Sequence, residues 1–166
     1  MGVEVERKYL VVGESWREAV TRSFRIVQGY LTDTGPAVVR VRVRDERAYL
    51  TIKGSSSGIS RSEFEYEIPV EDALDMLGEL ATGPVIDKVR HLVPVGGHTW
   101  EVDVFSGDNA PLIMAEVELG SPGEAFEVPG WVGFEVSDDQ RYYNVNLARD
   151  PYSRWGDSSF FGPAED

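Results

Sequence analysis

The chain alternates apolar and charged residues with a period of two. The clearest case is residues 37–44, where Val39, Val41 and Val43 alternate with Arg40, Arg42 and Arg44. Successive side chains of a β-strand point to opposite faces, so this pattern predicts a strand with one apolar and one basic face. Similar patterns predict seven further strands, at residues 3–12, 23–32, 47–53, 61–68, 85–95, 99–105 and 112–119.

The segments between these strands contain turn and helix signals. Asp45-Glu46 and Gly96-Gly97 predict hairpins, and residues 54–58 form a small-residue connection. Helices are predicted at residues 14–20, 70–80 and 137–148, the last with Ser137 as N-cap and Gln140 completing a capping box. Strands in hairpin order with a few helices indicate an α+β protein with an antiparallel sheet, either open or closed into a barrel.

The charges on the strands are sorted by sign. Lys88 and Arg90 share one strand face, whereas Glu101 with Asp103 and Glu116 with Glu118 form acidic faces. An ordinary solvated face would also alternate, but such faces usually mix the two signs. Same-sign neighbours on a strand repel unless a counter-charge lies against them. We therefore predict an eight-stranded antiparallel β-barrel with a charged interior, with apolar residues turned outward and helices packed outside.

A basic wall and an acidic wall inside one barrel indicate a polyanion and its metal ions. Lysine and arginine bind phosphate oxygens, and carboxylates bind hard divalent cations. The basic wall would comprise Lys8, Arg40, Arg42, Lys53, Lys88 and Arg90. The acidic wall would comprise Glu4, Glu6, Glu101, Asp103, Glu116 and Glu118.

Length and composition restrict the class of protein. The 166 residues are most simply one domain, which we place at residues 1–150, with residues 151–166 as a tail that is part of the same domain or frayed. No cysteine is present and no run of about twenty apolar residues occurs, so we expect a cytoplasmic protein without a membrane partner. The formal charge of -13 argues against nucleic-acid binding through the overall field.

Several motifs resemble one known family. Glu4-Val5-Glu6-Arg7-Lys8 is similar to the ExExK signature of the CYTH, or triphosphate tunnel metalloenzyme, superfamily. Further matches follow in the family's order, at residues 40–42, 51–53, 61–65, 88–90, 101–105, 116–118 and 142–144. A single ExExK would be weak evidence, but this ordered set covers nearly the whole domain.

The resemblance implies a tunnel-shaped barrel, a small-molecule triphosphate substrate and Mg²⁺ or Mn²⁺ as cofactor. The catalytic residues it suggests are Lys8, Arg40, Arg42, Glu101 and Asp103. Triphosphate-binding residues would be Lys8, Arg40, Arg42, Lys53, Arg61, Lys88 and Arg90. Metal ligands would be Glu4, Glu6, Glu63, Glu65, Asp103, Glu116 and Glu118.

Members of this superfamily catalyse different reactions. We expect divalent-metal-dependent hydrolysis of tripolyphosphate to pyrophosphate and phosphate, by a monomer or homodimer. Gln28-Gly29-Tyr30-Leu31 stands where cyclase and thiamine triphosphatase members tend to carry an Asp and paired aromatics, which disfavours recognition of a base. The alternatives are a nucleoside triphosphatase, a class IV-type adenylate cyclase, a non-catalytic polyphosphate or nucleotide-binding module, and a structural β-domain.

Overall fold

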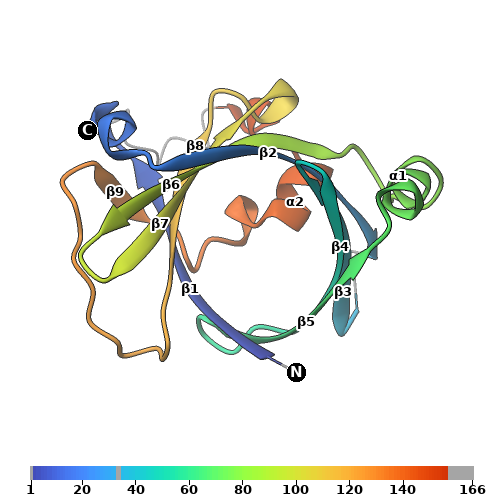
Figure 1. The fold of residues 1–166 in the computed structure, drawn as a ribbon, viewed down its shortest axis with the longest axis horizontal. Coiled ribbons are helices and arrows are strands. Elements are labelled where there is room, and N and C mark those ends of the chain that lie inside the picture. Colours follow the sequence, from blue (N-terminus) through green and yellow to red (C-terminus); the bar gives the residue numbers. More distant parts are fainter. Residues whose placement is uncertain (1, 33–34, 157–166) are drawn as a thin grey trace.

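Eight strands close into an antiparallel barrel, as the alternation predicted (Figure 1). The computed structural model describes residues 2–32 and 35–156. Neighbouring strands follow the order β5-β4-β3-β2-β6-β7-β8-β1, and pairing of β1 with β5 completes the ring. The strands are β1 (Gly2–Val11), β2 (Arg22–Thr32), β3 (Ala37–Arg44), β4 (Arg47–Gly54), β5 (Ser60–Ile68), β6 (Ile86–Val95), β7 (His98–Phe105) and β8 (Ile113–Glu118).

A ninth strand, β9 (Val132–Glu135), was not predicted from the sequence. It pairs with β1 outside the ring, with Tyr9 opposite Glu135 and Val11 opposite Val132. A side chain at Gly133 would come within 3.1 Å of the Leu10 carbonyl oxygen, so glycine permits this close approach. Four residues that include a glycine carry too little alternation to indicate a strand.

One apolar outer face is covered by a helix, as predicted. Helix α1 (Val70–Glu79) lies against β3 and β4 on the outside of the barrel (Figure 1). Val41 of β3 and Ala48 of β4 pack with Ala73 of α1, and all three side chains have no exposed surface. Asp45 adopts φ 54° in the tight turn between these two strands.

The opposite outer face is covered differently from the prediction. Trp100 has no exposed surface and packs with Tyr9 and Trp131, with ring centroids 5.5 and 5.6 Å away. The covering segments are the 3-10 helix η1 (Ser15–Ala19), which supplies Trp16, the loop before β9, and β9 itself. Irregular segments rather than α-helices therefore bury the outward side chains of β1, β6, β7 and β8.

The single helix predicted at residues 137–148 is instead two shorter helices that begin later. Asp139, not Ser137, caps a short 3-10 helix η3 (Gln140–Tyr142), and its carboxylate accepts from the Arg141 N–H at 3.1 Å. The hydroxyl of Ser137 instead accepts from the backbone N–H of Lys8 at 2.9 Å. Tyr143 is extended, so helix α2 (Asn144–Arg149) starts separately and is followed by η4 (Tyr152–Arg154).

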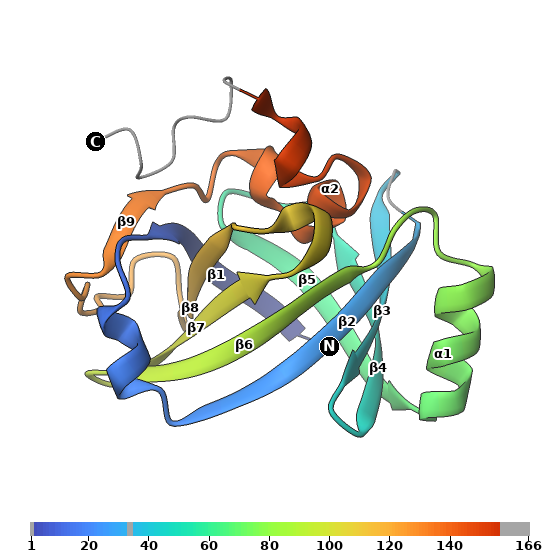
Figure 2. The ribbon, with the colours of Figure 1, turned by 90° about the horizontal axis from the view of Figure 1, so that it is seen from above.

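This C-terminal region covers one mouth of the barrel (Figure 2). The inward-facing residues at that end are apolar rather than charged, and they pack against Tyr142, Leu147 and Trp155. They are Leu10, Tyr30, Ile86, Phe105 and Met114. The charged interior predicted from the sequence therefore stops at this end of the bore, which is closed by an apolar floor.

The tail also differs from a frayed end as far as the structure describes it. Pro151 is buried, and Tyr152 and Trp155 pack into the same apolar cluster. Residues 151–156 thus pack against the barrel, and the rest of the predicted tail, 157–166, lies outside the described residues. Within residues 2–32 and 35–156, every helix is too short or too polar to cross a membrane.

Candidate active site

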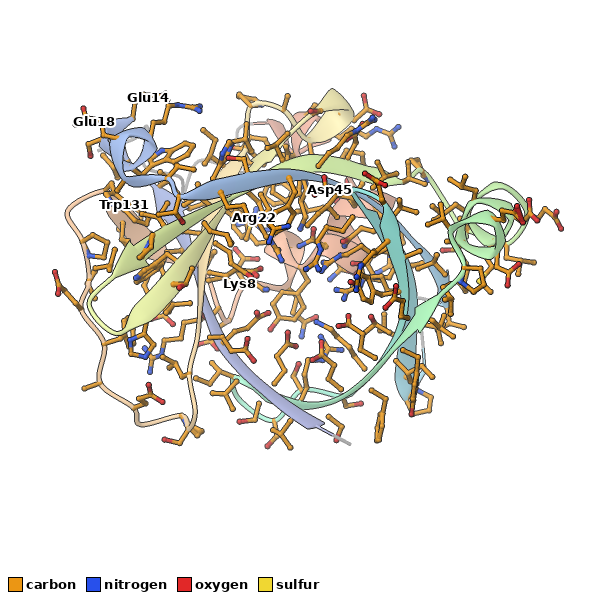
Figure 3. The ribbon with its side chains drawn as sticks, in the orientation of Figure 1. Lys8, Glu14, Glu18, Arg22, Asp45 and Trp131 are labelled. Carbon is orange, nitrogen blue, oxygen red and sulfur yellow. The ribbon has the colours of Figure 1, made fainter. Side chains whose placement is uncertain are left out.

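The bore encloses a cavity of about 250 Å³ that collects charged side chains from all parts of the sequence. Lys8 points from β1 into the ring (Figure 3). Of the predicted site residues, only Asp103 does not line the cavity. Those that do are Glu4, Glu6, Lys8, Arg40, Arg42, Lys53, Arg61, Glu63, Glu65, Lys88, Arg90, Glu101, Glu116 and Glu118.

Lys8 is held by two carboxylates. Its Nζ lies 2.8 Å from Glu6 Oε1 and 2.7 Å from Glu116 Oε2, the first on the same strand and the second on β8. Burial disfavours the ammonium, but Glu116 and Glu6 outweigh it and raise the pKa of Lys8 above its ordinary value. Lys8 is therefore a fixed positive charge in the cavity.

Lys53 occupies a similar place near the N-terminal end of β1. Its Nζ donates to Glu4 Oε1 at 2.9 Å and lies 3.7 Å from Glu63 Oε2. Burial and the charge of Arg40 lower the pKa of Lys53, and Glu4 partly offsets this. Strands β1, β4 and β5 thus bring one ammonium and two carboxylates together.

Asp103 holds two basic side chains, Lys88 and Arg90, in place. Its carboxylate accepts from Arg90 Nε and Nη2 at 2.8 and 2.9 Å and lies 2.7 Å from Lys88 Nζ. Lys88 has no exposed surface, and its Nζ also donates to Asn144 Oδ1 of α2 at 2.8 Å. Burial, with Arg90 and Arg42 nearby, lowers the pKa of Lys88 to about 7, against the opposing effect of Asp103.

Together, the three arginines of β3 have fewer carboxylate partners than the lysines of the cavity. Arg40 Nη2 contacts Thr51 at 3.2 Å and Glu65 at 3.5 Å, and its buried Nε has no hydrogen-bond partner among the described residues. Neither Arg42 nor Arg44 forms a salt bridge within the described part of the chain. Burial and the neighbouring arginines lower the pKa of Arg42 to about 9, so a bound anion would relieve this repulsion. Unpaired guanidinium groups facing a buried cavity are strong donors for an anion.

Several lining residues were missed by the sequence analysis. Arg44 lies on the same strand face as Arg40 and Arg42, so the alternation could have identified it as a lining residue. Ser137, Tyr143 and Asn144 come from the C-terminal region. Residues 142–144 were among the motifs that resemble the family but were not assigned to the site, and the irregular sequence gives no alternation that would indicate Ser137. The Tyr143 ring lies 5.7 Å from Lys8 Nζ, so the C-terminal region contributes directly to the site.

The carboxylates have the donor chemistry of a divalent-metal site. Glu6 and Glu118 face each other on β1 and β8. Burial raises the pKa of Glu118, and the nearby charges of Glu4 and Glu6 raise it further. A cation among these oxygens would relieve that repulsion. Within residues 2–32 and 35–156, no three acidic or histidine side chains converge as placed, because most of these carboxylates are turned to lysine or arginine.

Comparisons with known proteins agree with this geometry. The chain is 44% identical over 155 residues to an inorganic triphosphatase of Acetivibrio thermocellus, covering 93% of this chain and 99% of that protein. It is 36% identical over 149 residues to an inorganic triphosphatase of Nitrosomonas europaea, covering 87% and 96%. A crystal structure of an inorganic triphosphatase superposes with a TM-score of 0.65 at 34% identity, covering 89% of this chain and 95% of the other.

A family profile tests the resemblance seen in the sequence motifs. The CYTH domain profile matches residues 2–146, from the first described residue to the middle of α2. The match spans every strand of the barrel and all the cavity-lining residues. The chain belongs to the CYTH domain family.

Proposed function

We propose that this protein is an inorganic triphosphatase that hydrolyses tripolyphosphate to pyrophosphate and phosphate with a divalent metal ion. The observation that carries the proposal is the cavity itself, which is small and lined mainly by lysine, arginine and glutamate. Its volume of about 250 Å³ is below the ~300–1,000 Å³ of sites for drug-sized ligands. The activity of the two curated relatives supports the same substrate.

The basic residues would bind the substrate and stabilise the charge that develops during phosphoryl transfer. Arg40, Arg42 and Arg44 form one continuous basic row on β3, with donors left over after their protein contacts. Lys8, Lys53 and Arg90 face the cavity from other strands. Positioning and electrostatic stabilisation are the main contributions that a protein makes to this reaction.

The acidic residues divide into two roles in this proposal. Glu4, Glu6, Glu116 and Glu118 would hold Mg²⁺ or Mn²⁺, with Glu63 and Glu65 on the neighbouring wall. A metal ion held by these residues would supply positive charge for the phosphate oxygens and would lower the pKa of a bound water. Asp103 keeps Lys88 and Arg90 in position, and Glu101 contacts Arg90 Nη1 at 3.2 Å at the edge of the cavity.

Phosphate release from tripolyphosphate, ATP and thiamine triphosphate, each with Mg²⁺, Mn²⁺ or EDTA, tests the proposal. We expect metal-dependent release that is fastest with tripolyphosphate. Faster release from ATP would favour a nucleoside triphosphatase, and cyclic AMP with pyrophosphate would favour a cyclase. Tight tripolyphosphate binding without release from any substrate would indicate a binding module.

Two further expectations stay predictions. A monomer or homodimer can be distinguished by sedimentation, and the cytoplasmic location by fractionation of the producing cell.

A further inference from the structure

Arg42 is anchored by a neutral side chain, whereas most of the other basic residues of the bore are held by carboxylates. Its Nε donates to the side-chain oxygen of Gln28 at 2.7 Å. Lys8, Lys53, Lys88, Arg40 and Arg90 each have a carboxylate within the distance of a salt bridge. Arg42 has a neutral amide instead, so its positive charge is not cancelled by its own anchor.

The orientation of the Gln28 amide is fixed by its two neighbours. Arginine nitrogens can only donate, so the atom of Gln28 that faces Arg42 must be the carbonyl oxygen. The amide nitrogen then faces Tyr30 and donates to its hydroxyl oxygen at 2.9 Å. Gln28 has no exposed surface and Tyr30 is 6% exposed, so water competes little for either bond.

The backbone holds these three residues in register. Gln28 lies opposite Arg42 in the pairing of β2 with β3, and Tyr30 lies two residues further along β2 on the same face. The bond to Gln28 uses Nε of Arg42. It leaves the two terminal nitrogens of this cavity-lining residue as donors for a phosphate group.

We propose that Gln28, held by Tyr30, is a positioning residue that aims Arg42 at the substrate without neutralising it. The inference rests on the proposed function, because it takes a phosphate oxygen as the partner of Arg42. A glutamate would fit the same space and reach the same nitrogen, but it would pair with Arg42 and repel a triphosphate. The neutral amide thus supplies alignment while the full positive charge stays available to the anion.

A double-mutant cycle on tripolyphosphate binding tests the proposal. Binding is measured calorimetrically in EDTA for the full chain, Gln28→Met, Arg42→Ala and the double variant. Coupled neighbours typically interact by amounts equivalent to about 2-fold to 100-fold in affinity. We expect Gln28→Met to weaken binding about 10-fold when Arg42 is present and less than about 2-fold in the Arg42→Ala background. An equal loss in both backgrounds would overturn the positioning role.

Gln28→Glu separates alignment from charge. It keeps the hydrogen bond to Arg42 and adds one negative charge, so we expect weaker tripolyphosphate binding than in Gln28→Met and a raised KM. The matched control is Gln140→Glu, which makes the same chemical change at the exposed Gln140. Binding by Gln28→Glu equal to that of Gln140→Glu would contradict the proposal.

The outcomes separate the inference from the proposed function. A wild-type chain that binds tripolyphosphate in EDTA but releases no phosphate with metal would overturn the proposed function and leave the binding cycle interpretable. A wild-type chain that hydrolyses tripolyphosphate, combined with an uncoupled cycle, would overturn only the role of Gln28. Tyr30→Phe provides a second variant, because it removes the oxygen that accepts from Gln28 and should weaken binding only when Arg42 is present.

Discussion

Single residues in the bore fall into two classes by their partners. Lys8 and Lys53 are tied to carboxylates, whereas Arg42 and Arg44 form no salt bridge in residues 2–32 and 35–156. A tied lysine must exchange a protein oxygen for a substrate oxygen. An untied arginine gains its first anionic partner from the substrate. The second class should therefore give the larger loss of binding when it is truncated.

Arg42→Ala should lower kcat/KM for tripolyphosphate by about 100-fold or more, because it removes a charge that stabilises the transferring phosphoryl group. The measurement is steady-state phosphate release, with the thermal midpoint checked in parallel. Arg25→Ala is the matched control, because Arg25 pairs with Asp87 and is exposed. Retained activity in Arg42→Ala would remove Arg42 from the site.

Glu116→Gln should abolish metal-dependent activity and leave a folded protein. The substitution keeps the shape of the side chain but removes the charge that Lys8 and Arg90 contact, at 2.7 and 3.7 Å. Activity is measured over a range of Mg²⁺ and Mn²⁺ concentrations. Full activity at ordinary metal concentrations would argue against Glu116 as a metal ligand.

At the scale of elements, the inner face of each barrel strand contributes to the candidate site, and the outer face contributes to the apolar clusters that stabilise the fold. Strand β7 shows both roles, because Glu101 and Asp103 face inward while Trp100 and Val102 are fully buried outside the ring. The outer clusters hold η1, α1 and β9 against the barrel. Their loss should change the stability of the fold rather than the chemistry of the cavity.

Trp100→Ala should lower the free energy of unfolding by about 3–5 kcal/mol. Trp100 has no exposed surface, and its ring packs with those of Tyr9, Phe126 and Trp131. Denaturant unfolding followed by circular dichroism measures the loss. Trp100→Phe should retain much of the stability, and a Trp100→Ala loss below about 1 kcal/mol would contradict the packing argument.

Leu147→Ala tests the C-terminal cover of the barrel. Leu147 has no exposed surface and packs against the apolar floor, so its truncation should cost about 2–5 kcal/mol. Because α2 also carries Asn144, which contacts Lys88, activity should fall in the same variant. Hydrogen exchange would show whether α2 is loosened in this variant. Unchanged activity with a loosened α2 would show that activity does not require the C-terminal cover.

The sequence predicted the barrel because the alternation encodes it locally. Arg40, Arg42 and Arg44 reveal their shared face by spacing alone, and the same holds for Lys88 with Arg90. The approach of Gln28 to Arg42 and of Asn144 to Lys88 could not be predicted, because strand order and the path of the C-terminal region bring them together. The hydrogen bond between Ser137 and the backbone of Lys8 spans 129 positions, so no local pattern indicates it. The sequence therefore suggested a helix cap at Ser137 instead.

At the scale of the whole molecule, the net charge repels a polyanion, whereas the basic residues of the site attract it. The formal charge is -13, yet the cavity lining combines basic and acidic residues in similar numbers. The excess negative charge is therefore carried by residues that do not line the cavity. The exterior field should slow the approach of a polyanion at low salt, and the local cations must overcome it.

Tripolyphosphate should raise the thermal midpoint of the protein. A ligand at 100 times its Kd stabilises the folded state by about 2.7 kcal/mol, which corresponds to roughly 5–11 °C for a domain of this size. Thermal unfolding with tripolyphosphate, with an equal concentration of sulfate as the control, measures the effect. A shift no greater than that with sulfate would indicate that the bore does not hold the triphosphate.

The alternation of faces has a consequence for how the protein tolerates mutation. In an ordinary globular domain, the most buried positions are those whose replacement unfolds the protein. In this barrel two interleaved sets of positions should appear along each strand when every residue is varied. In the middle of β7, Glu101 and Asp103 would report activity, whereas Trp100 and Val102, which alternate with them, would report abundance. A scan that measures both quantities would trace the inner and outer surfaces of the ring from phenotype alone.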